Sequence, residues 1–281
     1  IWGTMLGLSA TMLSMFGIFG AILSGTGGAE TFIKMGQRFT GRFTGGSGKG
    51  SVVASSLFGM ISGSAIGNVV ATGVFTIPSM KKAGYTNEWA ATVEAVSSTG
   101  GQIMPPIMGA AAFIMAQLIG VNYIQIAKAA IVPALLYYLS TFLSIHLVSV
   151  RDGIKGSNEK PTIKVGDYLI ILVPLVIFIG FLLAGYTVLI GAFYATIGAL
   201  AMYVVRFIVS TKGDVKAVAK DTGKVCYNTV INGTNSIIDM CGILAGSQIT
   251  VSLINLTGFG VKLSDVIVSI GQGNMFLCLL C

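Results

Sequence analysis

The stretch GSVVASSLFGMISGSAIGNVVATGVFTIPSMKKAGY at residues 50–85 decides the fold, together with TNEWAATVEAVSSTGGQIMPPIMGAAAFIMAQLIG at 86–120. Both stretches are apolar, but glycine, serine or proline interrupts each of them where a membrane helix would be continuous. Backbone in hydrocarbon must satisfy its own hydrogen bonds, so non-helical backbone occurs there only where protein or a cavity surrounds it. Two such interrupted segments are typical of the binding site of a transporter.

The composition indicates an all-α integral membrane protein. Hydrophobic residues make up 54% of the 281 residues and charged residues only 10%. A soluble domain carries about a quarter charged residues. We therefore expect a multi-span helical bundle in a lipid bilayer.

The net charge of +7 does not indicate nucleic-acid binding. The basic residues fall in short clusters between apolar segments, at 34–49, 81–82, 151–164 and 206–224. This is the pattern of cytoplasmic loops in membrane proteins. A nucleic-acid-binding face would instead need these residues on one soluble surface.

The apolar segments predict several membrane spans, because about 20 apolar residues cross a bilayer. The sequence divides into four parts: a first span and a basic cytoplasmic loop (1–49), the two interrupted segments (50–119), connecting spans and cytoplasmic loops (120–224), and a last apolar part (225–281). Within these parts we expect spans at 4–24, 124–150, 168–185 and 188–209, and the beginning of another at 266–281.

Charge and length predict that residues 50–80 form a re-entrant hairpin. Lys49 precedes the segment and Lys81 and Lys82 follow it, so both ends are expected on the cytoplasmic side. One crossing would separate these lysines, and two crossings need about 40 residues. Two half-length helices fit both constraints, with a tip near Ser64–Asn68.

Residues 88–119 are expected to cross the membrane as a broken helix. The sequence TGGQIMPP begins at Thr99 and ends with Pro105 and Pro106. Glycine disfavours helix, and proline removes a donor and clashes with the preceding turn. The prediction is two half-helices joined by an unwound segment.

The hairpin tip and the unwound segment could ligate a cation. Backbone carbonyls left without helical partners can bind Na⁺, and half-helix N-termini favour an anion. Hydroxyl and amide groups add ligands suited to a hard cation, at Ser62, Ser64, Asn68, Thr72, Ser97, Ser98, Thr99 and Gln102. The alternative is that these small polar residues only permit close helix packing.

Three ionisable residues in apolar segments leave their roles open. Glu94 precedes the break and is either functional or at the cytoplasmic boundary facing water. The same alternatives hold for Asp239. His146 lies at the expected cytoplasmic end of a span, where an interfacial histidine is favoured over a proton relay.

Enzyme chemistry is not expected. GGSGKGS at 45–51 departs from the phosphate-binding loop pattern, because Phe43 and Gly50 stand where that pattern requires Gly and Ser or Thr. Cys278 and Cys281 are separated by two residues and have no partner histidine, so a metal site is disfavoured. No nucleophile–base pair stands out in the sequence, and no cofactor is expected beyond a coupling ion.

The quoted segments resemble the large membrane component of tripartite ATP-independent periplasmic (TRAP) transporters, closest to the fused permease type. The resemblance rests on four stretches: SSLFGMISGSAIGNVVATGVFTIPSMKKAGY at 55–85, VEAVSSTGGQIMPPIMGAAAFIMA at 93–116, VPALLYYL at 132–139 and LTGFGVKLS at 256–264. It covers nearly the whole chain, and the second stretch is its most specific part.

The resemblance implies an Na⁺-driven secondary transporter of the elevator type, in the inner membrane of a bacterium or archaeon. It implies organic-acid substrates, a TAXI-like periplasmic binding protein as partner, and small-component helices fused upstream. It also implies inverted repeats, with this chain as a fragment that contains the first repeat and the start of the second at 225–281.

By the same resemblance, the sodium site draws on the hairpin tip and the break, with Na⁺ at Ser64, Asn68 and Thr99. The candidate binding residues are Ser62, Gly63, Ser64, Asn68, Thr99, Gly100, Gly101, Gln102, Pro105 and Pro106. The alternative function is a channel or a non-transporting membrane scaffold. A channel would need a continuous polar stripe, and the spans at 168–209 show none.

Overall fold

The computed structural model describes residues 7, 10, 11, 14–156, 165–210 and 215–271. Regular structure in these residues is helical throughout, as the composition predicts. The helices are α2 (Ser14–Gly25), α3 (Gly28–Thr40), α4 (Gly46–Ser62), α5 (Ala65–Lys82), α6 (Asn87–Gly100), α7 (Ala110–Ile119), α8 (Tyr123–Arg151), α9 (Val165–Leu183), α10 (Val188–Ser210), α11 (Val215–Leu256) and α12 (Phe259–Gly271).

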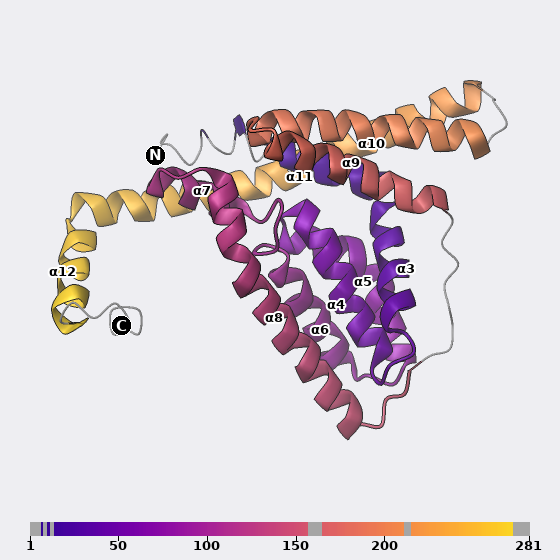
Figure 1. Cartoon of the computed structure of the whole chain (residues 1–281), viewed down its shortest axis with the longest axis horizontal. Coiled ribbons are helices and arrows are strands. Elements are labelled where there is room, and N and C mark those ends of the chain that lie inside the picture. The colour runs from indigo at the N-terminus through magenta and orange to yellow at the C-terminus, as the bar shows by residue number, and fades with distance from the viewer. Residues whose placement is uncertain (1–6, 8–9, 12–13, 157–164, 211–214, 272–281) are drawn as a thin grey trace. The chain divides into compact units, whose positions relative to one another are not determined.

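The chain divides into two compact units, Thr11–Ile237 and a second one made of Ile238–Cys281 with Ile1–Ala10. The first unit contains both interrupted segments. Within it α4, α5 and α6 pack against one another, α3 packs on α4, and α8 runs along α4 and α6 (Figure 1). Helices α9 and α10 form a second packed pair, joined by an ion pair between Asp167 and Arg206 at 2.5 Å.

A helical hairpin is present as α4 and α5, but its arms of 17 and 18 residues are longer than the half-length helices predicted within 50–80, and its re-entrant course in the membrane stays a prediction. Gly63 ends α4 in the left-handed conformation, with φ of 62°, and its N–H donates to the carbonyl of Gly59. Ser64 then begins α5, because its hydroxyl accepts a hydrogen bond from the N–H of Gly67. A C-terminal glycine cap followed directly by an N-terminal serine cap makes a two-residue tip. The tip thus lies at Gly63–Ser64, and Asn68 falls inside α5 rather than in the turn.

The predicted break separates α6 from α7. Helix α6 begins after Thr86, whose hydroxyl caps the N–H of Trp89, and ends at Gly100. Non-helical backbone covers 101–109 and is closed by a hydrogen bond from the Gly109 N–H to the Gln102 carbonyl, at 2.7 Å. The two half-helices expected at 88–119 are therefore confirmed.

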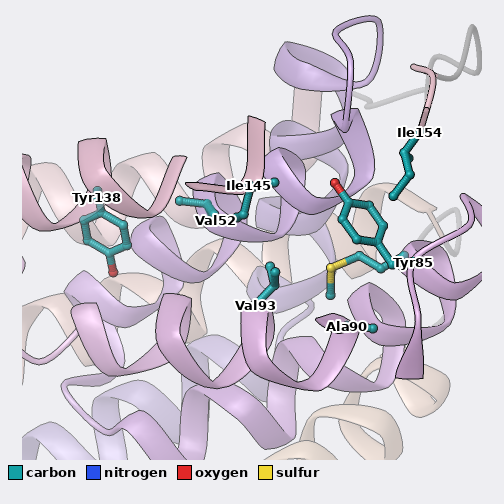
Figure 2. Close-up of a cluster of buried hydrophobic side chains, with 8 residues drawn as sticks. Val52, Tyr85, Ala90, Val93, Tyr138, Ile145 and Ile154 are labelled. Carbon is teal, nitrogen blue, oxygen red and sulfur yellow. The ribbon is translucent and has the colours of Figure 1, made fainter. Parts of the chain in front are cut away.

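A cluster of buried apolar side chains holds the hairpin, α6 and α8 together (Figure 2). It contains Val52, Met80, Tyr85, Ala90, Val93, Tyr138, Ile145 and Ile154. Tyr85 shares a hydrogen bond with Ser149 at 2.5 Å, which satisfies its hydroxyl at the edge of this cluster. The cluster makes these four helices one packed body.

Three helices, α8, α9 and α10, are long and apolar enough to cross a membrane. Two bent helix pairs would raise the number of spans in the described residues to five if each counts as one. Large apolar side chains on α8 are exposed, among them Leu139 and Leu143, as expected of a surface that faces lipid. The spans predicted at 124–150, 168–185 and 188–209 match these helices.

The basic loop predicted after the first span, within 1–49, is partly wrong, because residues 28–40 form α3. Apolar and polar residues lie on opposite faces of α3, and Phe32 and Ile33 are buried. The sequence showed this amphipathic pattern, but its glycines and basic residues favoured a loop. Only part of the span predicted at 4–24 is described, as α2, and most of the one at 266–281 lies outside the described residues.

Candidate functional site

The hairpin tip contacts the break of the second segment directly. The backbone N–H of Ile107 donates to the carbonyl of Met60 at 3.2 Å. A Cβ added to Gly59 would lie 2.5 Å from the Cα of Gly101, and one added to Gly63 would lie 2.2 Å from the carbonyl oxygen of Met108. Glycine is therefore needed at these positions so that the two backbones can approach.

Tyrosines of α8 hold the carbonyls around the break. Tyr123 donates to the carbonyl of Pro106 at 2.9 Å and also contacts that of Ile107. Further along α8, Tyr138 donates to the carbonyl of Ser97 at 3.1 Å. These bonds fix the end of α6 and the segment after it against α8.

Asn68 is fully buried beneath the tip. Its Nδ2 donates to the carbonyl of Ser55 on α4 at 2.8 Å and lies 3.5 Å from the carbonyl of Ser98 on α6. Its Oδ1 lies 3.3 Å from Oγ1 of Thr72. Asn68 thus links both hairpin arms with the broken helix.

The other two residues predicted to ligate Na⁺ make local bonds. Ser64 Oγ caps α5, and Thr99 Oγ1 donates to the carbonyl of Ala95 in its own helix at 2.8 Å. Thr99 is also exposed. A sodium ion shared by Ser64, Asn68 and Thr99 stays a prediction.

The remaining predicted residues lie at the same junction. Gly100 is buried against the ring of Tyr137, and Gly101 follows it at the approach to Gly59. Gln102, Pro105 and Pro106 belong to the non-helical segment after α6, where the side chain of Gln102 is exposed.

Two buried hydroxyls near the junction make no hydrogen bond within the described residues. They are Ser62 Oγ, at the end of α4, and Ser97 Oγ, on α6. Buried polar atoms are normally satisfied, so each is a candidate ligand position.

Glu94 lies at the centre of a hydroxyl cage formed by three helices. Its side chain is fully buried, so it does not face water at a membrane boundary. Oε2 accepts from Ser51 at 2.6 Å and from Thr76 at 2.5 Å. Oε1 accepts from Ser55 at 3.3 Å, from Ser98 at 3.2 Å and from Thr72.

Sequence reasoning did not single out three members of this cage: Ser51, Ser55 and Thr76. The signal that could have found them is a four-residue spacing of polar residues in apolar helices. Ser51 and Ser55 share one face of α4, as do Thr72 and Thr76 on α5. On α6 the spacing pairs Glu94 with Ser98.

A second buried ionisable contact joins α4 to α8. Lys49 is 4% exposed, and its Nζ lies 3.1 Å from Nδ1 of His146 and 5.0 Å from the ring centre of Phe142. His146 is thus a partner of Lys49 rather than a free interfacial side chain. The side chain of Asp239 lies outside the described residues.

The junction offers oxygen ligands in the form of hydroxyls, carbonyls, the amides of Asn68 and Gln102, and one carboxylate. No group of three His, Cys, Asp or Glu side chains gathers in the residues that the structure describes. Oxygen ligands of this kind suit a hard cation such as Na⁺ better than a transition metal.

The chain matches a family model over residues 2–281. The model is described as tripartite ATP-independent periplasmic transporter, DctM component.

Individual relatives match over a smaller part of the chain than the family model does. A C4-dicarboxylate TRAP transporter large permease protein of Vibrio cholerae is 32% identical over 54% of this chain and 33% of its own length. A sialic acid TRAP transporter permease protein of Haemophilus influenzae is 28% identical over 49% of this chain and 22% of its own length. The large permease protein of a Vibrio cholerae sialic acid TRAP transporter is 24% identical over 60% and 40%. The chain therefore spans well under half the length of these relatives.

Proposed function

Because the chain belongs to the DctM-component family of tripartite ATP-independent periplasmic transporters, we propose that it is part of a permease that carries an organic acid with Na⁺. The family is one of transporters, which argues for a multi-pass membrane protein without enzymatic activity. The observation that supports the proposal best is the junction of hairpin tip and helix break, where two non-helical segments meet between half-helices.

An organic anion suits the helix ends at the junction. Helix α5 begins at Ala65 and α7 at Ala110, each at the end of a non-helical segment. A helix N-terminus carries unpaired N–H groups and a positive dipole end, which favour a carboxylate. The named relatives transport C4-dicarboxylates and sialic acid, both of which are carboxylates. We infer a substrate of this chemical class.

Sodium suits the oxygen ligands. The junction contains uncharged oxygen ligands of the kind that bind Na⁺ without a large cost of dehydration: Asn68 Oδ1, the buried hydroxyl of Ser62 and the carbonyls around the break. We propose Na⁺ as the coupling ion, held between the tip and the break by Ser64, Asn68 and Thr99 together with backbone carbonyls.

The expected partners follow from the resemblance to the fused type of permease. They are a periplasmic binding protein of the TAXI-like class and small-component helices fused upstream. The expected location is the inner membrane. The exposed apolar surface of α8, α9 and α10 supports contact with lipid.

Uptake into proteoliposomes tests this proposal. The intact permease would be reconstituted with its binding protein, and uptake of labelled succinate and of sialic acid would be followed under an inward Na⁺ gradient. We expect one carboxylate to accumulate only when both the Na⁺ gradient and the binding protein are present. Accumulation with K⁺ in place of Na⁺ would contradict Na⁺ coupling, and non-saturable flux in both directions would favour a channel.

A further inference from the structure

We propose that Glu94 is a positioning residue of the sodium site: it takes the hydroxyl proton of Thr72 and so leaves Asn68 Oδ1 free to bind Na⁺. The inference rests on the proposed function, because it assumes that Na⁺ binds at Asn68. It assigns a role to the only carboxylate within the helices α4, α5 and α6 that is fully buried.

The orientation of the Asn68 amide follows from its neighbours. Two backbone carbonyls, those of Ser55 and Ser98, lie within reach of one end of the amide. Carbonyls only accept, so the NH₂ group must face them. Oδ1 therefore faces Thr72, the hydroxyl 3.3 Å away.

Thr72 has one proton and four possible acceptors within reach, the most distant being Ser55 Oγ at 3.4 Å, which has its own proton to donate to Glu94. Its Oγ1 lies 2.8 Å from the Asn68 carbonyl, 3.3 Å from Asn68 Oδ1, and in contact with Glu94 Oε1. A hydrogen bond to a carboxylate is about twice as strong as one to a neutral acceptor. Glu94 therefore takes the proton, and Asn68 Oδ1 is left with lone pairs and no donor from Thr72.

The cage makes a charged Glu94 tolerable in this buried position. Four further hydroxyls donate to its two oxygens, from Ser51, Ser55, Thr76 and Ser98. Burying a charge is costly unless hydrogen bonds compensate. No ion pair joins Glu94 to a basic side chain in the part of the chain that the structure describes. Its negative charge is therefore not neutralised by a fixed cation and attracts a mobile one nearby.

The basic groups on the neighbouring helices have other partners or are exposed: on α3, Lys34 pairs with Glu30 at 2.7 Å and Arg38 is exposed. Lys49 on α4 contacts His146 of α8, and Lys81 and Lys82 are exposed at the far end of α5. Tyrosines 137 and 138 of α8 donate to backbone carbonyls of α6. The cation that the Glu94 charge attracts must therefore come from solution.

Replacing the charged Glu94 with a neutral residue should make Asn68 Oδ1 less available to Na⁺. In Glu94→Gln the amide oxygen is a weaker acceptor, so the Thr72 hydroxyl is shared between the two oxygens of Asn68, its carbonyl at 2.8 Å and Oδ1 at 3.3 Å, and Oδ1 gains a hydrogen bond that the carboxylate had prevented. Sodium must then displace that hydrogen bond. We expect the half-saturating Na⁺ concentration to rise roughly tenfold, which corresponds to about 1.4 kcal/mol.

The measurement needs no substrate. The purified intact permease is titrated with NaCl, with KCl keeping the ionic strength constant, and the thermal unfolding midpoint reports Na⁺ binding. The sharp test is a second substitution in the Glu94→Gln background. Thr72→Val removes the hydroxyl that covers Oδ1 and should restore at least half of the lost affinity, on a logarithmic scale. Thr76→Val is the matched control on the same helix, because Thr76 contacts Glu94 but not Asn68, and it should restore nothing.

A purely structural role predicts the opposite, since removing a second contact should weaken the site further. Three results would each overturn the inference while leaving Na⁺ coupling intact. They are an unchanged half-saturating Na⁺ concentration in Glu94→Gln, no rescue of Na⁺ affinity by Thr72→Val, and equal rescue by Thr76→Val. A wild-type permease that does not respond to Na⁺ would overturn the proposed function and this inference with it.

Should Glu94→Gln not accumulate in the membrane, Glu94→Asp provides the second test. It keeps the charge, so its half-saturating Na⁺ concentration should stay within about threefold of wild type even where its stability falls. A shift of tenfold or more in Glu94→Asp would overturn the role assigned to the charge.

Discussion

At the scale of single residues, the close approach of Gly59 and Gly101 sets the distance between the hairpin and the break. A Cβ on Gly101 would lie 2.6 Å from the Cα of Gly59, and backbone atoms on both sides leave it no room. We expect Gly101→Ala to lower stability by about 1–3 kcal/mol, as overpacking does. Uptake should fall with it, because the junction opens.

The matched control is Gly180→Ala, on α9. A Cβ there meets nothing within 4 Å, and alanine favours helix over glycine by up to about 1 kcal/mol. Thermal unfolding in detergent and uptake in proteoliposomes would be measured for both variants. Equal effects of the two substitutions would show that the contact between Gly59 and Gly101 does not matter.

Residue types alone could predict the kind of chemistry at the junction but not its arrangement. Asn68 was expected near the tip, and the structure buries it there between three helices. The local bonds of Ser64 and Thr99 could not be foreseen, because a hydroxyl in a helix can bond to its own backbone as readily as to a ligand. Whether Glu94 is functional or faces water at the membrane boundary depended on the burial of its side chain, and the sequence alone does not give the burial of a single side chain.

At the scale of elements, the hairpin α4–α5 predicts that its two ends lie on the same side of the membrane. Phe43 and Lys82 flank the hairpin and are exposed, so cysteines there should react with a membrane-impermeant thiol reagent from the same side. Gly48 is unsuitable as a labelling position, because a Cβ there would lie 2.7 Å from the Tyr85 hydroxyl oxygen.

Val121, between α7 and α8, serves as the reference for the opposite side. The broken helix α6–α7 separates it from Lys82, and its loop carries no charge. The labelling would be done in a background without the native cysteines. Labelling of Phe43→Cys and Lys82→Cys from opposite sides would exclude a re-entrant hairpin.

The element boundaries were predictable where a strong local rule applied. Gly63 stands at the end of α4, and Pro105 and Pro106 lie within the non-helical segment 101–109, because the backbone preferences of glycine and proline act locally. Helix α3 was missed, because its apolar face with Phe32 and Ile33 stabilises the helix only when it is buried against a partner helix, here α4. Tertiary packing thus decided the structure of α3, where the local signals conflicted.

At the scale of the whole molecule, two bends of the same kind occur in the described residues. Helices α2 and α3 meet at 67° across Thr26–Gly27, and α11 and α12 meet at 71° across Thr257–Gly258. Both glycines have positive φ, 92° and 65°. The same Thr-Gly dipeptide, with its glycine in the same left-handed region, thus makes both bends, and a second repeat beginning within 225–281 stays a prediction.

The lipid-facing surface gives a prediction for the first unit as a whole. Along α8, Leu143 is 50% exposed, whereas Ile145, two residues on, is 2% exposed and packs in the cluster of Figure 2. A soluble protein rarely exposes a long apolar stripe of this kind, so lipid is the expected neighbour of Leu143.

A nitroxide spin label at Leu143→Cys should therefore collide often with oxygen, which dissolves in lipid, and rarely with a water-soluble nickel complex. A label at Ile145→Cys should be immobilised and collide rarely with both. Frequent collision of the Leu143 label with nickel would mean that this face of α8 lies in water, and rare collision with both reagents would mean that protein covers it. Either result would remove α8 from the lipid boundary, because the apolar stripe would then need a different neighbour.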